Sequence, residues 1–579
     1  MSTTDDRFVH ACSLSDLQTE GRKLVNKRGH AIALFYHDDE VRAVDNRCPH
    51  MGFPLTEGTV DDGILTCHWH HARFELSCGD TFDPWADDVL AYPVEVRDGE
   101  VYVEPDPEPD EPPAEHWANR LETGLEENLR LVVAKATIGL LDAGVDPADP
   151  LAQGVAFGTR FREQGWGRGL TILALLGNVL PALDEQDQKR ALYTGLRHVA
   201  SDCAGQSPNF DQPSFSTREV EPARLERWFR ENVEVRDSDG AERVLRTAVA
   251  TCDREHVERM LFAAATDHRY LDTGHTLDFV NKAVETLDTV GWDAADDTLA
   301  SLVDSLTQAE RSEERSSWRQ PVDLAAMLED AFDDLDELVA AGEGESWTEP
   351  DDLQTTLLDD DPQAIVDSLT DAIAAGATTE QLAHAVAHAA ASRVARFGTS
   401  NEFSDWNTVH HTFTYANAVH QATRRIEATE LYRGVFDAAA NVYLDRFLNT
   451  PPAEIPEPGE TGRDPDVVLD DLVETFDQEG SVNRAGELVG EFFDAGGDPD
   501  DLKRTLGNCL LREDANFHTL QAYEAGVRQF QLAESDERGR TAMVAIARYM
   551  AAHFPTRREA EQTFTIASRL LRGESIHEE

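Results

Sequence analysis

The sequence of 579 residues has few lysines and a large deficit of positive charge. It contains 111 acidic residues against 51 basic ones, which gives a formal net charge of −60 at pH 7. Because binding to phosphate backbones requires clustered lysine and arginine, this composition argues against a nucleic-acid partner. The six lysines are Lys23, Lys27, Lys135, Lys189, Lys282 and Lys503.

The acidic residues are spread over the whole chain, and arginine is preferred to lysine among the basic ones. Such a surface stays hydrated in concentrated salt, where the Debye length falls to about 3 Å and repulsion between like charges is screened. The composition resembles that of haloarchaeal cytoplasmic proteins and predicts a halophilic protein. A generic acidic protein, or one that docks on a basic partner, is the alternative interpretation.

Long apolar runs and a cysteine framework are also missing. The most apolar stretch, Leu170–Leu183, is too short to span a membrane and contains Asn178 and Pro181. Residues Met1–Arg7 lead into a polar, acidic start without the apolar core of a secretory signal. Five scattered cysteines are typical of a reducing compartment, so we expect a cytoplasmic protein without a membrane span. They are Cys12, Cys78, Cys203, Cys252 and Cys509.

Two short cysteine–histidine motifs are the most informative feature of the chain. The segment Cys48–His50 reads C-x-H and is followed, after sixteen residues, by Cys67–His70, which reads C-x-x-H. This set resembles the Rieske [2Fe-2S] family, in which two cysteines bind one iron and two histidines bind the other. The resemblance implies that one [2Fe-2S] cluster is held by Cys48, His50, Cys67 and His70.

Zinc is the alternative occupant, since two cysteines and two histidines also suit that ion. Zinc would not require two near-identical loops that each supply one cysteine and one histidine, which favours the iron–sulfur interpretation. The resemblance to the Rieske family covers about residues 6 to 105. It includes the segments Cys48–Leu55, Glu57–Thr59 and Gly63–Cys67.

Three positions near the motifs bear on the subtype. High-potential Rieske proteins carry an extra cysteine in each ligand loop, and the two form a disulfide. Phe53 and Trp69 occupy those positions here, so the loops resemble the ferredoxin and oxygenase type, which has a lower potential. The family usually has glycine after the last histidine, where this chain has His71. We expect the bulkier residue to change loop packing or solvent access, and the potential with it.

The chain is expected to be multidomain, with a small all-β Rieske domain followed by a large all-α repeat or bundle domain. Residues 1–104 read as short strands, residues 105–116 as an acidic, proline-rich linker, and residues 117–579 as helices with 3.6-residue periodicity. Sub-boundaries are predicted near 342–350 and 451–460. Strands are predicted at Ala31–Tyr36, Val41–Val44, Ile64–Cys67, Arg73–Leu76, Val94–Val96 and Val101–Val103.

The helical part shows internal repetition. Asp142–Pro147 recurs as Asp494–Pro499, with a looser copy at Ala375–Thr378. A second shared segment follows these markers, and diverged helical hairpins packed as a bundle or solenoid are expected. Its copies are Gly274–Val280, His410–Ala416 and Phe517–Tyr523, and a further copy at Gly169–Leu173 has leucine in place of the histidine.

Histidines in these repeats suggest a second site. His384 and His388 stand four residues apart on one predicted helix, so both project from the same face. Imidazoles and carboxylates on helices that face a bundle interior can hold non-haem iron with positions open for oxygen. Packing of these histidines in the core is the alternative. The candidates for an additional iron site or a catalytic role are Asp272, His275, His384, His388, His411 and His518.

The helical part does not fit the usual recipient of Rieske electrons. Asp272 and His275 begin the D-x2-H-x4-H pattern of ring-hydroxylating oxygenases, but Val280 stands at its end and the context is helical. Over about residues 120 to 560, the layout resembles questin oxidase-type proteins, which are α-helical oxidoreductases associated with oxidative ring cleavage of polyketides. The segments Trp406–His411 and Ala416–His420 carry this resemblance.

A Rieske cluster moves one electron at a time and performs no substrate chemistry alone. We therefore expect an oxidoreductase whose cluster supplies electrons to a helical domain that acts on an unknown organic substrate. A ferredoxin, a reductase or another redox partner would supply the electrons. The alternative is a non-catalytic electron carrier or redox-responsive scaffold whose helical repeats bind a protein partner.

Overall fold

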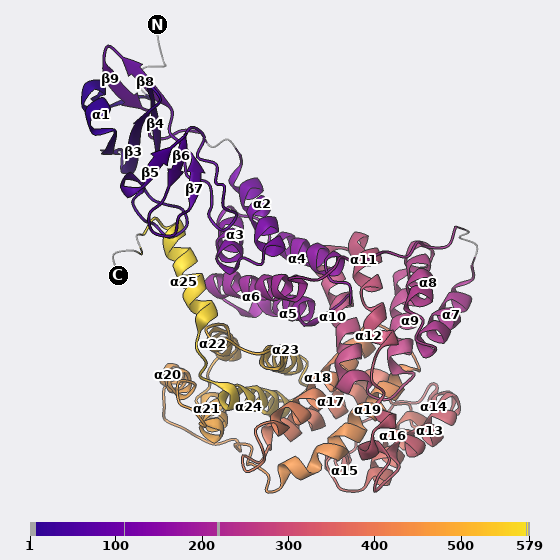
Figure 1. Cartoon of the computed structure of the whole chain (residues 1–579). Coiled ribbons are helices and arrows are strands. Elements are labelled where there is room, and N and C mark those ends of the chain that lie inside the picture. Colours follow the sequence, from indigo (N-terminus) through magenta and orange to yellow (C-terminus); the bar gives the residue numbers. More distant parts are fainter. Residues whose placement is uncertain (1–6, 109–110, 217–219, 575, 577–579) are drawn as a thin grey trace. The chain divides into compact units, whose positions relative to one another are not determined.

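The computed structural model describes residues 7–108, 111–216, 220–574 and 576 (Figure 1). The chain divides into two compact units. The first comprises Met1–Pro150 together with Ala560–Glu579, and the second comprises Leu151–Glu559. Within the described residues, no helix is long and apolar enough to cross a membrane.

The first unit begins with three small antiparallel sheets. In order across each sheet, they are β1 (Val9–Ser13), β9 (Glu100–Val103) and β8 (Val94–Arg97); β2 (Arg22–Lys27), β3 (His30–His37) and β4 (Glu40–Asp45); and β5 (Thr59–Asp61), β6 (Ile64–Thr66) and β7 (Arg73–Glu75). A short helix, α1 (Leu14–Glu20), follows β1. A small β domain followed by a large helical region confirms the predicted fold class.

The second and third sheets and the loops beside them enclose an apolar core. Phe35, Leu65 and Phe74 are almost fully buried there, and the sulfur-bearing Cys48 and Cys67 belong to the same cluster of side chains. Burial of each large apolar side chain contributes about 1.5–3 kcal/mol to folding. The two cysteines are therefore presented from a rigid, dry scaffold.

Helices make up the rest of the chain. Helix α2 begins at Pro113, inside the segment 105–116 predicted as a linker, of which residues 109–110 lie outside the described residues. Proline is well suited to the first turn because its missing N–H is not needed there. The first unit contains α2 (Pro113–Glu126) and α3 (Arg130–Asp142), so it extends beyond the β domain. The helices that follow are α4 (Ala148–Arg160), α5 (Arg168–Val179), α6 (Glu185–Cys203), α7 (Pro222–Glu234), α8 (Ser238–Thr251), α9 (Arg254–Thr266), α10 (His275–Val290), α11 (Ala295–Ala300), α12 (Val303–Thr307), α13 (Leu324–Asp333), α14 (Leu335–Gly342), α15 (Leu353–Leu357), α16 (Pro362–Ala374), α17 (Thr379–Ala395), α18 (Asp405–Thr423), α19 (Leu431–Leu444), α20 (Pro465–Thr475), α21 (Val482–Asp494), α22 (Pro499–Leu511), α23 (Phe517–Gln531), α24 (Asp536–His553) and α25 (Glu559–Leu571).

The first repeated motif is a turn between two helices. Asp142–Pro147 joins α3 to α4, and Asp494–Pro499 joins α21 to α22. Gly144 and Gly496 both have positive φ, at 80° and 72°, which is the left-handed conformation that ends many helices. At both places the repeated motif therefore ends one helix and connects it to the next.

The second repeated segment marks four helices that pack together. Helix α10 contacts α5 and α18, and α23 also contacts α5 and α18, so the four form a bundle within the second unit. Side-chain contacts join His411 to His518 near the start of α18 and α23, and Gln421 to Arg528 about three turns further along both helices. Helices in corresponding positions therefore run parallel, as expected for stacked hairpins.

Candidate functional site

Two loops of the β domain carry the cysteine–histidine motifs. The first lies between β4 and Leu55, and the second connects β6 to β7. In each loop the cysteine N–H donates to the carbonyl five residues later, Phe53 or Ala72, over 2.8 Å. The residue four positions after each cysteine donates back to the cysteine carbonyl, over 2.7 Å from Gly52 and 3.1 Å from His71. The two loops are therefore built on the same turn.

This shared turn explains the usual glycine at position 71. Gly52 and His71 occupy equivalent places, and both have positive φ, at 82° and 65°. Glycine adopts that conformation without steric cost, whereas a residue with a Cβ is strained in it. His71 is exposed, so its side chain does not fill space between the loops.

The four motif residues converge. Cys48 and Cys67 are 2% and 1% exposed, and their thiols contact one another. The contact between the two thiols lowers the pKa of Cys67 and raises that of Cys48, so the pair shares one proton. The rings of His50 and His70 lie side by side, with centroids 4.7 Å apart.

The residues present fit a [2Fe-2S] cluster. The Nδ1 atom of His50 is buried and has no hydrogen-bond partner among the described residues, although buried polar atoms normally have one. An iron ion would satisfy this nitrogen. The Trp85 ring lies 4.6 Å from the His50 ring and helps bury it, whereas His70 is exposed. The two histidines thus differ in access, and His70 is the one that faces solvent.

Two aromatic residues, Phe53 and Trp69, stand where high-potential Rieske proteins have their extra cysteines. Phe53 and Trp69 lie with ring centroids 6.1 Å apart. The seven cysteines of the chain are all free thiols. Among them, Cys78 is exposed, whereas Cys48 and Cys67 in the ligand loops are buried.

A buried ion pair supports the first loop and was not predicted from the sequence. Lys135 of α3 donates to the Pro49 carbonyl and to Asp87 over 2.8 Å, and Arg120 of α2 donates to Asp87 over 2.9 Å. Burial raises the pKa of Asp87, but the two cations outweigh it and hold that pKa below its ordinary value. Helices α2 and α3 therefore bring two positive charges to the loop that carries His50. Only an arrangement in space brings these residues together, so no local sequence signal marks them.

A second cluster of chemically active side chains lies in the four-helix bundle of the second unit. The candidate ligand nitrogens of His275, His411 and His518 all lie within 4.8 Å of one another. The Nε2 atoms of His411 and His518 are 3.0 Å apart. Burial, with a smaller contribution from the positive charge of Arg168 in each case, lowers the pKa values of His275, His411 and His518 to about 3, 2 and 4. At neutral pH the three imidazoles are uncharged and can bind a metal.

A layer of buried polar groups continues along the bundle from these histidines. His410 contacts the Gln521 amide oxygen at 3.5 Å, and the Gln521 amide nitrogen donates to Asp278 over 2.6 Å. Burial raises the pKa of Asp278 to about 7. Next along α10, Lys282 donates to Glu285 over 3.1 Å and to Glu524 over 3.0 Å.

Buried charges of this kind stabilise a fold poorly, because desolvation offsets most of their attraction. Groups with perturbed pKa values collect at functional sites. The interior of the bundle, from the histidines to this lysine, is therefore a candidate site and not an ordinary apolar core.

The other predicted candidates lie elsewhere. The Asp272 carboxylate accepts from the backbone of Glu310 over 2.8 Å and from the Thr276 hydroxyl over 3.4 Å, and it is outside the histidine group. His384 contacts Arg538 at 3.3 Å and stacks near His420, with ring centroids 5.1 Å apart. His388 lines a surface pocket with residues of α15 and α24. Among the described residues, the three histidines of the bundle are the one group of three or more His, Cys, Asp or Glu side chains whose ligand atoms all lie within 4.8 Å of one another.

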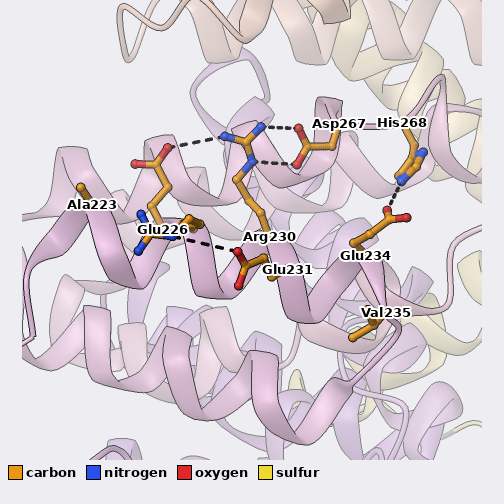
Figure 2. Close-up of a pocket in the computed structure, with 9 residues that line it drawn as sticks. Ala223, Glu226, Arg230, Glu231, Glu234, Val235, Asp267 and His268 are labelled. Carbon is orange, nitrogen blue, oxygen red and sulfur yellow. Dashed lines mark hydrogen bonds and ion pairs between the residues drawn. The ribbon is translucent and has the colours of Figure 1, made fainter.

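A surface pocket along α7 is lined by charged side chains that pair with one another (Figure 2). Arg230 donates to Asp267 over 2.7 Å, and His268 contacts Glu234 at 2.5 Å. Figure 2 shows these side chains directed toward one another across the pocket. Since the charges neutralise each other in pairs, this surface has no set of groups poised for catalysis.

Comparison with known proteins supports the first site. Residues 7–93 match the family model described as Rieske [2Fe-2S] domain. The chain is 35% identical over 97 residues to the 3-phenylpropionate/cinnamic acid dioxygenase ferredoxin subunit of Photorhabdus laumondii, which covers 16% of this chain and 91% of that protein. It is 32% identical over 93 residues to apoptosis-inducing factor 3 of Homo sapiens, which covers 16% of this chain. The chain spans only 15% of that human protein's length.

A solved structure shows the same extent of similarity. The complex of reduced oxygenase and oxidised ferredoxin in carbazole 1,9a-dioxygenase is 28% identical, with a TM-score of 0.17, and covers 18% of this chain and 100% of that chain. The predicted Rieske domain and its cofactor are confirmed. Through residues 7–93, the chain belongs to the Rieske [2Fe-2S] family, and this domain binds a [2Fe-2S] cluster.

Proposed function

We propose that the chain is an electron-transfer protein and an oxidoreductase, in which Cys48, His50, Cys67 and His70 hold the cluster. The observation that carries the proposal is the pair of equivalent loops, which present two buried thiols and two neighbouring imidazoles. When bound, the cluster supplies reversible one-electron chemistry. The two thiols contact one another and the two imidazole rings lie with centroids 4.7 Å apart, so each pair is placed to hold one iron.

The buried cysteines and the exposed His70 have different roles in this proposal. The apolar core around Cys48 and Cys67 excludes water from the thiolates. His70 is exposed and is therefore the ligand through which a redox partner gains the shortest access. The relative from Photorhabdus laumondii is named as a dioxygenase ferredoxin subunit, which supports a reductase or oxygenase as the partner.

We further propose that the helical unit receives these electrons and acts on an organic substrate. The polar interior of its four-helix bundle supports a chemical role, because a scaffold that only binds a partner has no need for buried charges such as Asp278 and Lys282. We place the protein in the cytoplasm of a halophile, on the basis of its acidic composition and scattered thiols.

Ligand substitution tests the proposal directly. We expect the purified full chain to contain two cluster irons and two acid-labile sulfides, and to bleach on reduction with dithionite. His70→Ala should remove the cluster signal, whereas His68→Ala, a change at an exposed neighbour, should leave it intact. Equal loss of the cluster in both variants, or retention in both, would show that His70 is not a ligand.

A further inference from the structure

We propose that His275, His411 and His518 bind one divalent first-row transition-metal ion. The three histidines lie in the second unit, and the proposal is based on the distances between them. It therefore does not depend on the function proposed for the cluster. Imidazole is a preferred ligand of zinc, copper, iron and nickel. Three histidines leave at least one coordination position open, as in catalytic metal sites.

The distances suit a single ion. Metal–nitrogen bonds of about 2.0–2.1 Å place two imidazole nitrogens on a tetrahedral ion about 3.3 Å apart. The three ligand nitrogens lie within 4.8 Å of one another, and the Nε2 atoms of His411 and His518 are 3.0 Å apart. Small side-chain rotations therefore bring all three onto one ion.

The repeat explains why the ligands number three. His275 and His518 stand in the first turns of α10 and α23, and His411 stands in the second turn of α18. The equivalent position on α5, the fourth helix of the bundle, is Leu170. The bundle thus supplies three imidazoles, and each of them is only partly buried, so a further ligand can reach the ion from solvent.

The surroundings indicate the class of that further ligand. The three donors are neutral, so a bound divalent ion keeps its full charge. Helices α5, α10 and α23 begin at the site, and the positive ends of their dipoles favour anions there. Arg168 adds a positive charge, with its guanidinium 5.8 Å from the centre of the Phe517 ring. We therefore infer that the open position takes an anionic oxygen or nitrogen donor.

Cobalt(II) provides a clean probe in the full-length holoprotein, because the oxidised [2Fe-2S] cluster is silent in electron paramagnetic resonance. After chelation of loosely bound metal, we expect one Co(II) per chain with a high-spin signal, which an excess of Zn(II) abolishes. Each of His275→Ala, His411→Ala and His518→Ala should weaken Co(II) binding by at least about 100-fold. Azide should change the signal of the bound Co(II).

The matched control changes another buried histidine pair in the same unit. The variant His384→Ala/His420→Ala should bind Co(II) as the parent does. Cluster absorption and far-ultraviolet circular dichroism establish that each variant is folded. If an alanine variant does not fold, Co(II) binding is measured in His411→Gln, which also removes one imidazole ligand. Absence of a stoichiometric Co(II) site in the parent, or equal weakening in the control, would overturn the metal site. An azide-insensitive signal would overturn the open anionic position. Cluster content is measured separately, so failure here leaves the electron-transfer proposal untouched.

Discussion

The buried contact of Lys135 with Asp87 offers a sharp test of how α3 supports the cluster loop. Removal of one partner of a buried ion pair costs about 3–5 kcal/mol when the other charge is left alone. Arg120 still pairs with Asp87 in Lys135→Met, which reduces this cost to about 2 kcal/mol. The Pro49 carbonyl also loses its donor, at about 1 kcal/mol. We therefore expect Lys135→Met to destabilise the first unit by about 3 kcal/mol.

The assay is guanidinium unfolding followed by the visible circular dichroism of the cluster, which reports on the first unit alone. Lys23→Met is the matched control, because Lys23 pairs with the exposed carboxylates of Glu20 and Asp16 at 3.7 and 3.8 Å, contacts that contribute about 0–1 kcal/mol. The double variant Lys135→Met/Asp87→Asn should recover part of the loss, since it removes the uncompensated carboxylate. Equal effects of the Lys135 and Lys23 changes would show that the buried ion pair does not stabilise the first unit.

The same pair should tune the reduction potential. Lys135→Met makes the surroundings of the cluster more negative and should lower the potential, whereas Asp87→Asn should raise it, each by tens of millivolts. Protein film voltammetry measures both shifts. Shifts of the same sign in the two variants would contradict an electrostatic origin.

Three further predictions concern other parts of the chain. Burial raises the pKa of Asp445 to about 7, so the folded carboxyl keeps a proton that the unfolded chain loses near pH 4. The contribution of Asp445 to the free energy of unfolding is fully present below about pH 4 and is lost as the pH rises through 7, a loss of up to about 4 kcal/mol. Asp445→Asn should therefore make the free energy of unfolding, measured with denaturant, depend less on pH between about 4 and 7. An unchanged pH dependence in this variant would contradict the raised pKa. His71→Gly should stabilise the first unit by about 0.5–1 kcal/mol, measured by the loss of cluster absorption on heating, because glycine relieves the left-handed strain at φ 65°. A lower melting temperature would show that the turn is not strained. With a net charge of −60, the full chain should melt at a higher temperature in molar KCl than in dilute buffer, and calorimetry showing the reverse would argue against halophily.

The sequence was most informative where chemistry fixes the spacing of residues. Two metal ligands two or three positions apart can serve one cluster only on a tight turn, so the motifs alone indicated both loops. Repetition was the second source of information. Because equivalent positions of stacked hairpins lie side by side, the recurring His-Thr steps pointed to His275, His411 and His518, which the structure brings together.

Other features depend on contacts between distant residues and left no local pattern. Asp272 is near His275 in sequence, but the turn η3 (Leu271–Gly274) directs its carboxylate to the Glu310 backbone. The strands β1, β2 and β5 were not predicted, and β5 has only three residues. The polar layer around Lys282 arises from helices that are more than 240 residues apart in the chain. Periodicity predicts the helices, but it does not specify which of them face one another.

We assign two histidines, His50 and His70, as the ligands of one iron of the cluster. Pulsed electron paramagnetic resonance of the dithionite-reduced full chain, labelled with ¹⁵N-histidine, tests this most directly. We predict a spin-one-half signal with strong couplings to two nitrogens, and the loss of that signal in His70→Ala. A reduced signal without strongly coupled nitrogen would indicate an all-cysteine cluster, and the absence of any signal together with bound zinc would contradict the assignment.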